Sequence, residues 1–343
     1  MLTLADEMRR VKVLVDRTIL EELLPRSSNI AEIDLLYQMM RDYPSRPAKG
    51  LRPFLCNVTC RAAGGREEDS LITAACIELF QHWILIHDDI EDQSELRRGQ
   101  PTLHRKYNLA LALNTGDALH AKMWGSLLLN EKQLGTAKTI GLLGEFSRMV
   151  GTTTEGQHME LGWVTNHRWD LGETDYIEMC TRKTSWYTVA GPCRLGAMVA
   201  GADAGVLDKL AQFGAKLGVA FQIQDDTLNL VGDQERYGKA TSDDLLEGKR
   251  TLILLTTIQR ASPGERSRIV SILNKERRLK TKSEIEYVVS LIEKYEAIEY
   301  SRKCARTLME QAVDTLRSIE WKGDEDAANL LASFSKFAVD RQW

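Results

Sequence analysis

Apolar residues recur at helical spacing along most of this chain. Phe213, Leu217 and Phe221 stand four residues apart, and a similar spacing returns between residues 285 and 295. Such spacing places the apolar side chains on one face of a helix. Strand-like alternation is scarce, only seven prolines occur, and no Asn-Gly or Asp-Gly pair marks a hairpin. The pattern predicts an all-α fold.

Short polar or glycine-containing stretches separate the helical segments. Examples are GGREED at 64–69, GADAG at 201–205 and SPGER at 262–266. Stretches of this length suit helix-to-helix connections, and none has the composition of an interdomain linker. There is no tandem repeat or low-complexity segment. We therefore predict a single all-α domain over residues 1–343.

The composition narrows the class of protein. Hydrophobic residues make up 43% of the chain and the net charge is -4, so no overall basic field favours nucleic acid. The six cysteines form no CxxC pair and are expected to be reduced. The N-terminus lacks a continuous apolar core, and the most apolar stretch, 71–86, is interrupted by polar residues. We expect a cytoplasmic protein without a membrane span.

Two apolar segments each lead into paired aspartates. ELFQHWILI runs into His87-Asp88-Asp89-Ile90-Glu91-Asp92, and LGVAFQI runs into a Gln-Asp-Asp triplet at 224–226. On a helix, Asp88 and Asp92 are one turn apart on the same face. A lone acidic pair usually solvates a helix end. Carboxylates at a helix C-terminus, however, oppose the helix dipole, so two such clusters indicate a bound cation.

Magnesium suits these clusters because it prefers a few carboxylates combined with substrate phosphate oxygens. Basic residues that could hold phosphate are also present. Lys49 and Arg52 lie in KGLRP, and Arg97 and Arg98 lie in RRG. Arginine offers paired donors and lysine a point charge. Taken singly, each basic site is more typical of surface charge; Lys183-Thr184, Lys239 and Lys249-Arg250 are weaker signals still.

Taken together, these segments resemble the trans-isoprenyl diphosphate synthase, or polyprenyl synthetase, family, and are most like its short-chain geranylgeranyl class. The matching segments follow in order: KGLRP at 49–53, HDDIEDQSELRRGQPTLH at 87–104, GD at 116–117, KTSWY at 183–187, FQIQDD at 221–226 and EGKRT at 247–251. The resemblance implies a large helical bundle around a central elongated cavity. It also implies a homodimer.

The resemblance further implies an enzyme that condenses isopentenyl diphosphate with an allylic diphosphate, using three magnesium ions when substrate is bound. Ionisation of the allylic carbon–oxygen bond is followed by attack of the isopentenyl double bond and loss of a proton. Charge on the leaving group needs cations, and the carbocation needs a water-poor wall. The implied metal ligands are Asp88, Asp89, Asp92 and Asp225, and the implied catalytic set adds Asp226 and Lys183.

The same resemblance assigns two groups of substrate-binding residues. The allylic substrate would be contacted by Arg97, Lys183, Thr184, Gln222, Lys239 and Lys249. Isopentenyl diphosphate would be held by Lys49, Arg52, Gln81 and Arg98. Separately, we interpret His82, His104, His120 and His158 as packing or hydrogen-bonding residues without a catalytic role.

Two positions depart from the family pattern. The last aspartate of the second DDxxD motif is replaced by Asn229, which keeps an oxygen ligand and loses a charge. Glu160, in GQHME, stands where family members often have aspartate. The first change is expected to weaken metal binding at position 229 without removing the Asp225 ligand.

Product length is predicted from the residues that precede Asp88 on its helix. Trp83 stands five residues before Asp88, where related short-chain enzymes place a bulky stopper, and Ile84 follows it. A tryptophan in an apolar helix is equally typical of core packing. Only two residues separate Asp89 from Asp92, so the motif carries no insertion. We expect a C20 product, with C15 as the next alternative.

Two other functions fit part of the pattern. A class I terpene cyclase also uses an aspartate-rich helix, but it would need neither the second aspartate pair nor the basic set at 49, 52 and 98. A non-catalytic partner subunit of a synthase would have no need to retain the acidic motifs. Both alternatives are weaker than the prenyltransferase.

Overall fold

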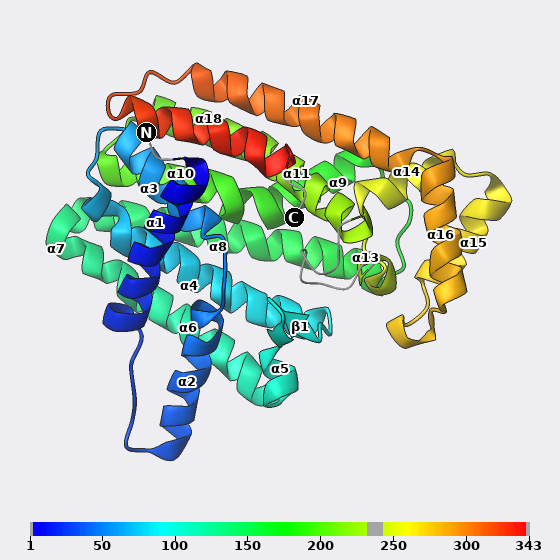
Figure 1. Ribbon diagram of the computed structural model, residues 1–343, viewed down its shortest axis with the longest axis horizontal. Coiled ribbons are helices and arrows are strands. Elements are labelled where there is room, and N and C mark those ends of the chain that lie inside the picture. Colours follow the sequence, from blue (N-terminus) through cyan, green and yellow to red (C-terminus); the bar gives the residue numbers. More distant parts are fainter. Residues whose placement is uncertain (1–2, 232–242, 341–343) are drawn as a thin grey trace. The chain divides into compact units, whose positions relative to one another are not determined.

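The computed structural model describes residues 3–231 and 243–340, and these residues are almost entirely helical (Figure 1). In chain order the elements are α1 (Leu4–Arg17), η1 (Thr18–Leu23), α2 (Ala31–Ser45), α3 (Leu51–Ala62), α4 (Glu67–Glu91), β1 (Leu96–Arg97), β2 (Gln100–Pro101), α5 (Leu103–Lys106), α6 (Leu109–Leu127), η2 (Leu128–Asn130), α7 (Glu131–Leu134), α8 (Thr136–Thr165), α9 (Glu173–Cys180), η3 (Thr181–Ala190), α10 (Gly191–Ala200), α11 (Ala204–Val231), α13 (Asp243–Glu247), α14 (Leu252–Arg260), α15 (Pro263–Leu273), η4 (Arg277–Leu279), α16 (Lys282–Lys294), α17 (Ala297–Arg317) and α18 (Glu325–Asp340). The predicted all-α class is confirmed.

The chain divides into two compact units, and each is described by itself. Unit 1 comprises residues 1–149, 187–211 and 316–334; unit 2 comprises 150–186, 212–315 and 335–343. The only sheet among the described residues is the short antiparallel ribbon β1-β2 in unit 1. It turns the chain sharply just after the first aspartate motif.

The core of unit 1 is built around α4, which packs against α3, α6 and α10. Figure 1 shows α4 and α6 side by side. Side chains such as Phe54, Ile77 and Phe80 are fully buried, and the rings of Phe54 and Phe334 lie 5.8 Å apart. Burial of large apolar side chains is the main force that fixes these helices. The helix that carries the first aspartate motif is therefore held along most of its length.

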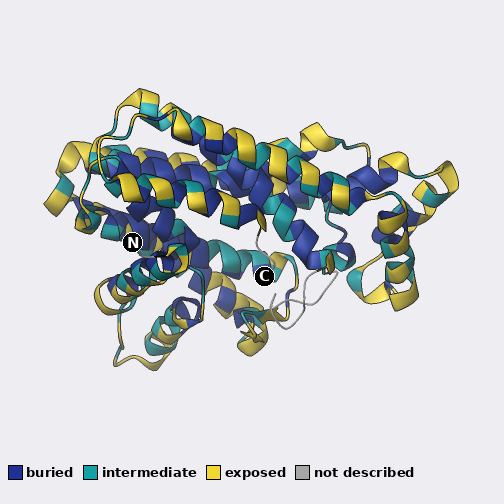
Figure 2. Cartoon of the chain, turned by 45° about the horizontal axis from the view of Figure 1, so that its top comes forward, coloured by how far each residue is buried: buried dark blue, intermediate teal, exposed yellow. Residues whose placement is uncertain are grey.

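Helix α4 is the one described helix that is long and apolar enough to cross a membrane. However, 67% of its most apolar window is buried within the structure. Figure 2 shows buried positions gathered on one side of many helix ribbons, with exposed positions on the opposite side. Most of this apolar window therefore contacts other parts of the protein, which is typical of a core helix.

Unit 2 contains two apolar clusters. One joins residues of α13, α14, α15 and α16 with Trp169 and Ala297. The other joins α9, α11 and α14 with Trp163, Ala305 and Val339. The second cluster surrounds the part of α11 that leads to the second aspartate pair, so that pair also lies on a well-packed helix.

Candidate active site

The first aspartate motif occupies the last turn of α4. Asp88 and Asp89 lie within the helix, and Asp92 caps its C-terminus with its backbone N–H donating to the Asp88 carbonyl at 2.8 Å. The side chain of Asp88 is 22% exposed, whereas Asp89 is completely buried. The predicted end of the apolar helix at this motif is confirmed, and its carboxylates stand at the negative end of the helix dipole.

Asp89 is held from two sides by donors. The Tyr43 hydroxyl of α2 donates to Asp89 Oδ2 at 2.5 Å, and Arg97 Nε donates to Oδ1 at 3.0 Å. Arg97 Nη2 also donates to Asp89 and lies 3.6 Å from Asp88 Oδ2. Burial opposes the charge on Arg97, but Asp89 outweighs it and raises the pKa of the guanidinium above its usual value. Asp89 is therefore a fixed, fully paired carboxylate.

A second arginine fixes the ribbon that carries Arg97 and Arg98. Arg46 is 3% exposed, forms an ion pair with Asp42 at 2.6 Å, and donates to the carbonyls of Arg97 and Pro101 at 2.9 and 2.8 Å. These bonds satisfy backbone acceptors that would otherwise be unpaired in a buried turn. Helix α2 thus sets the position of the ribbon through Arg46 and that of Asp89 through Tyr43.

Three residues predicted to bind isopentenyl diphosphate lie among buried polar groups of unit 1. Within the described residues, Arg52 Nε and Gln81 Oε1 are buried without a hydrogen-bond partner. Arg52 Nη2 donates to Thr188 at 2.8 Å, and its guanidinium stacks 4.3 Å from the Tyr187 ring centroid. Arg98 donates to the Tyr43 carbonyl at 3.2 Å. Unpaired buried polar atoms are costly, which favours a polar ligand here.

The acid–base state of this region reflects burial and an excess of cations. Burial, with Arg97 and Arg52 nearby, lowers the pKa of Arg98 below its usual value. Burial likewise lowers the pKa of His82, and Arg98 and Lys12 lower it further. Burial raises the pKa of Glu78. The region therefore carries net positive charge, as a site for a diphosphate requires.

Lys49 lies directly before α3 and owes its placement to Gly50. The backbone of Gly50 is left-handed, with φ of 63°, and a Cβ there would come within 2.9 Å of the Lys12 side chain from α1. Glycine is the residue that adopts this conformation without strain. The glycine of KGLRP is thus required by the turn that leads into α3.

The second aspartate pair lies inside α11, not at its end. The helix continues to Val231, so the prediction that the apolar helix ends at this pair is wrong. Leu228 is buried and continues the apolar face past the motif. The helix-dipole argument therefore applies to Asp88 and Asp92 but not to Asp225 and Asp226.

A chain of hydrogen bonds in unit 2 joins three of the predicted site residues. Thr184 Oγ1 donates to Gln222 Oε1 at 2.8 Å, and Gln222 Nε2 donates to Asp226 Oδ1 at 2.7 Å. The hydroxyl of Tyr176 in α9 donates to Asp226 Oδ2, also at 2.7 Å. Burial raises the pKa of Asp226 to about 7, against the effect of the Gln222 and Tyr176 bonds, and Asp225 adds to the rise.

Other predicted residues of unit 2 have acidic neighbours. Lys183 forms an ion pair with Glu160, the residue that replaces the family's usual aspartate. Lys249 pairs with Glu247 at 2.8 Å. Asn229 is 2% exposed, and its Oδ1 accepts from the backbone N–H of Asp244 at 3.2 Å, in the first turn of α13. Lys239 lies outside the described residues.

The predicted stoppers lie on α4 one turn before the motif. Trp83 is partly buried, and its ring contacts Phe80 at a centroid distance of 5.5 Å and His87 at 5.8 Å. Ile84 is also partly buried. Trp83 thus belongs to an aromatic cluster in the interior of unit 1.

No group of three or more histidine, cysteine or acidic side chains in the described ranges is arranged to hold a metal ion by itself. Asp88 and Asp92 nonetheless supply carboxylate oxygens one turn apart. Oxygen donors of this kind fit Mg²⁺, which commonly completes its shell with water and substrate phosphate instead of protein groups. The residues present therefore fit a metal that is bound together with its substrate.

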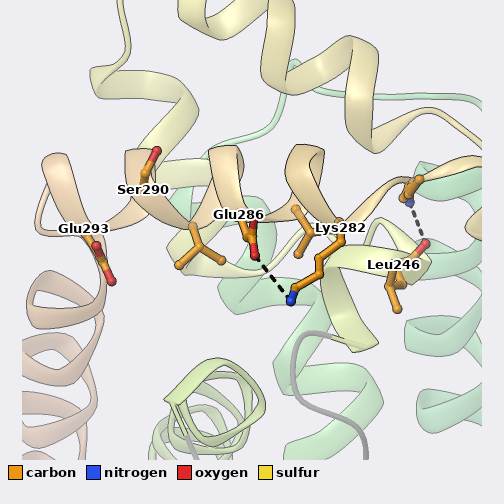
Figure 3. Close-up of a pocket in the computed structure, with 8 residues that line it drawn as sticks. Leu246, Lys282, Glu286, Ser290 and Glu293 are labelled. Atoms are coloured by element: carbon orange, nitrogen blue, oxygen red, sulfur yellow. Dashed lines mark hydrogen bonds and ion pairs between the residues drawn. The ribbon is translucent and has the colours of Figure 1, made fainter.

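A cavity of about 550 Å³ in unit 2 lies away from all of these residues. Helix α16 lines it with Lys282, Glu286, Ser290 and Glu293, and Leu246 of α13 borders it (Figure 3). Lys282 and Glu286, one turn apart on α16, form an ion pair at 3.7 Å. None of the residues predicted from the sequence contributes to this cavity.

Sequence reasoning missed Tyr43, Tyr176 and Arg46. Tyr43 and Tyr176 lie in different helices from the carboxylates that they contact, and Arg46 directly follows α2 and contacts the β1-β2 ribbon; none belongs to a short motif. A charged or hydroxyl side chain at an otherwise apolar helical position was the available signal, and it is a weak one.

Comparisons with known proteins agree with the arrangement of the motifs. A family model described as polyprenyl synthetase matches residues 33–292. The chain is 32% identical over 306 residues to a geranylgeranyl diphosphate synthase of Sulfolobus acidocaldarius, covering 89% of this chain and 91% of that protein.

Solved structures give the same result. The crystal structure of geranylgeranyl pyrophosphate synthetase from Pyrococcus horikoshii aligns with a TM-score of 0.86 and 28% identity, covering 98% of each chain. A geranylgeranyl pyrophosphate synthase from Corynebacterium glutamicum, solved with isoprenyl diphosphate and magnesium, has the same fold, with a TM-score of 0.89 and 24% identity over 99% of this chain and all of that one.

Proposed function

Because the chain belongs to the polyprenyl synthetase family, we propose that it is a magnesium-dependent trans-prenyltransferase. It condenses isopentenyl diphosphate head to tail with allylic diphosphates and releases a short all-trans prenyl diphosphate, C20 in preference to C15. The observation that carries this proposal is the end of α4, where a fully paired Asp89 stands beside the partly exposed Asp88.

The first motif is proposed to bind the diphosphate of the allylic substrate through magnesium. Asp88 and Asp92 would hold the ions, with Asp89 as the third acidic member, and Asp225 of the second motif would hold a further ion. Bound magnesium would stabilise the negative charge that develops on the leaving diphosphate. The three-ion count is taken over from the family resemblance.

Arg97 has two proposed tasks in this site. Its pairing with Asp89 fixes the carboxylate next to Asp88, and its Nη2 faces Asp88 at 3.6 Å. A guanidinium in this position can also donate to a phosphate oxygen near Asp88, because arginine has five N–H donors. The contact with the allylic substrate that the resemblance implies is compatible with this geometry.

The isopentenyl diphosphate is proposed to bind Lys49, Arg52, Gln81 and Arg98. Support comes from the unpaired donor Arg52 Nε and from the excess of cations around Glu78. Such a cluster can hold a diphosphate by direct donation, without a metal.

The remaining allylic contacts are proposed for Lys183, Thr184, Gln222 and Lys249, with Lys239 outside the described residues. Lys183 and Lys249 each have a glutamate partner. A phosphate would compete with that glutamate for the ammonium group. Thr184 and Gln222 would act through the hydrogen-bond chain that ends on Asp226.

The homodimer is proposed from an apolar surface of unit 1. Large hydrophobic residues of α6, η2 and α8 are well exposed: Leu109, Leu111, Leu113, Leu128, Leu129 and Ile140. Exposed large apolar side chains of this kind are candidates for burial in an interface. The single domain over residues 1–343, the central elongated cavity and the cytoplasmic location stay predictions.

The two alternative functions, a terpene cyclase and a non-catalytic partner subunit, would each leave some of these residues without a role. A terpene cyclase would leave the cationic cluster of Arg52 and Arg98 without a ligand. A non-catalytic partner subunit would not need the buried pairing that fixes Asp89. Both remain weaker than the prenyltransferase.

The proposal is tested by incubating the purified protein with Mg²⁺, isopentenyl diphosphate and, in separate reactions, C5, C10 and C15 allylic diphosphates. We expect elongation to C20, loss of product when EDTA removes the metal, and recovery when Mg²⁺ is restored. Cyclic hydrocarbon from the allylic substrate alone would favour the cyclase. Absence of any product with all three starters would favour the partner subunit.

A further inference from the structure

His120 of α6 lies flat against the side chain of Trp83. The two ring centroids are 3.9 Å apart, and the ring planes differ by 17°. This is the one stacked aromatic pair in the described part of the chain; the other ring contacts are tilted or edge-on. A face-to-face contact over the whole imidazole leaves no space for the indole to move towards α6.

The imidazole is itself fixed by the next turn of α6. Trp124 Nε1 donates a hydrogen bond to His120 Nε2 at 2.9 Å. Because Nε2 accepts, the ring proton of the neutral imidazole lies on Nδ1. Burial lowers the pKa of His120 below its usual value, in agreement with a neutral ring; Asp117 opposes this effect and His87 adds to it. Trp124 thus orients His120, and His120 supports Trp83.

The other contacts of Trp83 come from its own helix and from a close approach to α6. Phe80 and His87 meet the indole edge-on. Gly116 of α6 leaves room for His87 and Trp83: a Cβ at Gly116 would collide with His87 Nε2 and lie 3.4 Å from Trp83. Helix α6 therefore approaches α4 closely at Gly116, and one turn later its His120 ring stacks on Trp83.

We propose that His120 is a positioning residue for product length, which keeps the Trp83 ring in the place where it stops the growing chain. The inference rests on the proposed prenyltransferase function. A lone tryptophan can change rotamer under the pressure of a growing isoprenoid chain, whereas an indole backed by a fixed aromatic ring has to displace that ring as well.

The test compares product lengths for the wild type, Trp83→Ala, His120→Ala and His120→Phe with C15 allylic diphosphate, isopentenyl diphosphate and Mg²⁺. With Trp83 still present, His120→Ala should raise the ratio of C25 and longer products to C20 by about tenfold, in the range that a lost pocket contact provides. His120→Phe keeps an aromatic ring against the indole and should give the same distribution of product lengths as the wild type. Trp83→Ala should lengthen the products further.

A core variant separates this role from general loosening of the fold. Phe334→Leu weakens the Phe54–Phe334 contact in the same unit without touching Trp83, so it should lower the melting temperature and leave product length unchanged. The inference is overturned if His120→Ala gives the wild-type distribution, or if Phe334→Leu lengthens the products as much. If the wild type elongates no starter, the proposed function fails instead.

Discussion

The two aspartate motifs share a tyrosine hydrogen bond to a buried carboxylate but differ in the charge of the second donor. In each, the second aspartate is buried and accepts a tyrosine hydroxyl from another helix: Tyr43 bonds to Asp89 and Tyr176 to Asp226. The second donor is the charged Arg97 in the first motif and the neutral Gln222 in the second.

This difference has an electrostatic consequence. Arg97 brings a full positive charge to Asp89, so the buried carboxylate is compensated before any metal binds. From the described residues Asp226 receives only neutral donors, and burial raises its pKa to about 7. The first motif is thus preformed as a charged site, while the second depends more on what binds to it.

The largest expected effect is the fall in kcat when the first aspartate of either motif, Asp88 or Asp225, loses its carboxylate. Asp88→Asn should lower kcat about a thousandfold and Asp225→Asn about a hundredfold, because removing a group that stabilises developing charge typically costs factors of this size. The first motif should be the more sensitive, since more of the proposed ions lie there. Steady-state kinetics at saturating Mg²⁺ gives both values.

The exposed Asp208 of α11 provides a matched control. Asp208→Asn makes the same chemical change outside both motifs and should leave kcat unchanged. Equal losses of kcat for Asp88→Asn and Asp225→Asn would contradict the proposal that the first motif is the more sensitive. Full activity in either variant would remove that residue from the metal site.

Helical periodicity was sufficient to predict the fold class, because apolar faces of 3.6-residue period dominate the chain. The order of the short motifs was sufficient to identify the family. The end of α4 was also predictable, since its apolar run stops at Asp88 and the polar ribbon follows. The same reasoning failed for α11, where the apolar face continues through Leu228 and the helix reaches Val231.

The supporting contacts were not predictable from sequence. Tyr43 is 46 residues from Asp89 and Tyr176 is 50 residues from Asp226, and such distant pairs leave no local pattern. Asn229 illustrates the same limit. The sequence suggests a weakened metal ligand, whereas the side chain accepts from the backbone N–H of Asp244 at the start of α13, where the N–H groups of a helix have no partner within the helix.

The next largest effect concerns stability and compares the two second donors, Arg97 and Gln222, directly. Arg97→Leu leaves the buried Asp89 charge without its cation and should destabilise unit 1 by about 3–5 kcal/mol. Gln222→Leu removes one neutral donor from Asp226 and should cost about 1–3 kcal/mol. Thermal unfolding without substrate, followed by circular dichroism, measures both as shifts of the melting temperature.

A second substitution checks the reason for the Arg97 effect. If the unpaired charge is the cause, adding Asp89→Asn to Arg97→Leu should recover much of the lost stability. A double variant as unstable as Arg97→Leu alone would show that the loss comes from packing of the arginine stem. Equal effects of Arg97→Leu and Gln222→Leu would contradict the distinction between the motifs.

The last test concerns the tyrosine hydroxyl that each motif receives, whose loss should cost less than the loss of Arg97. Tyr43→Phe and Tyr176→Phe each remove one hydroxyl donor from a buried carboxylate, which typically costs about 1.5–3 kcal/mol. Tyr176→Phe should lie at the upper end, because Asp226 then keeps only an amide donor, whereas Asp89 keeps Arg97. Tyr37→Phe, at a partly exposed position of α2, should change little. A larger loss for Tyr43→Phe would mean that the hydroxyl, and not the arginine, is the main support of Asp89.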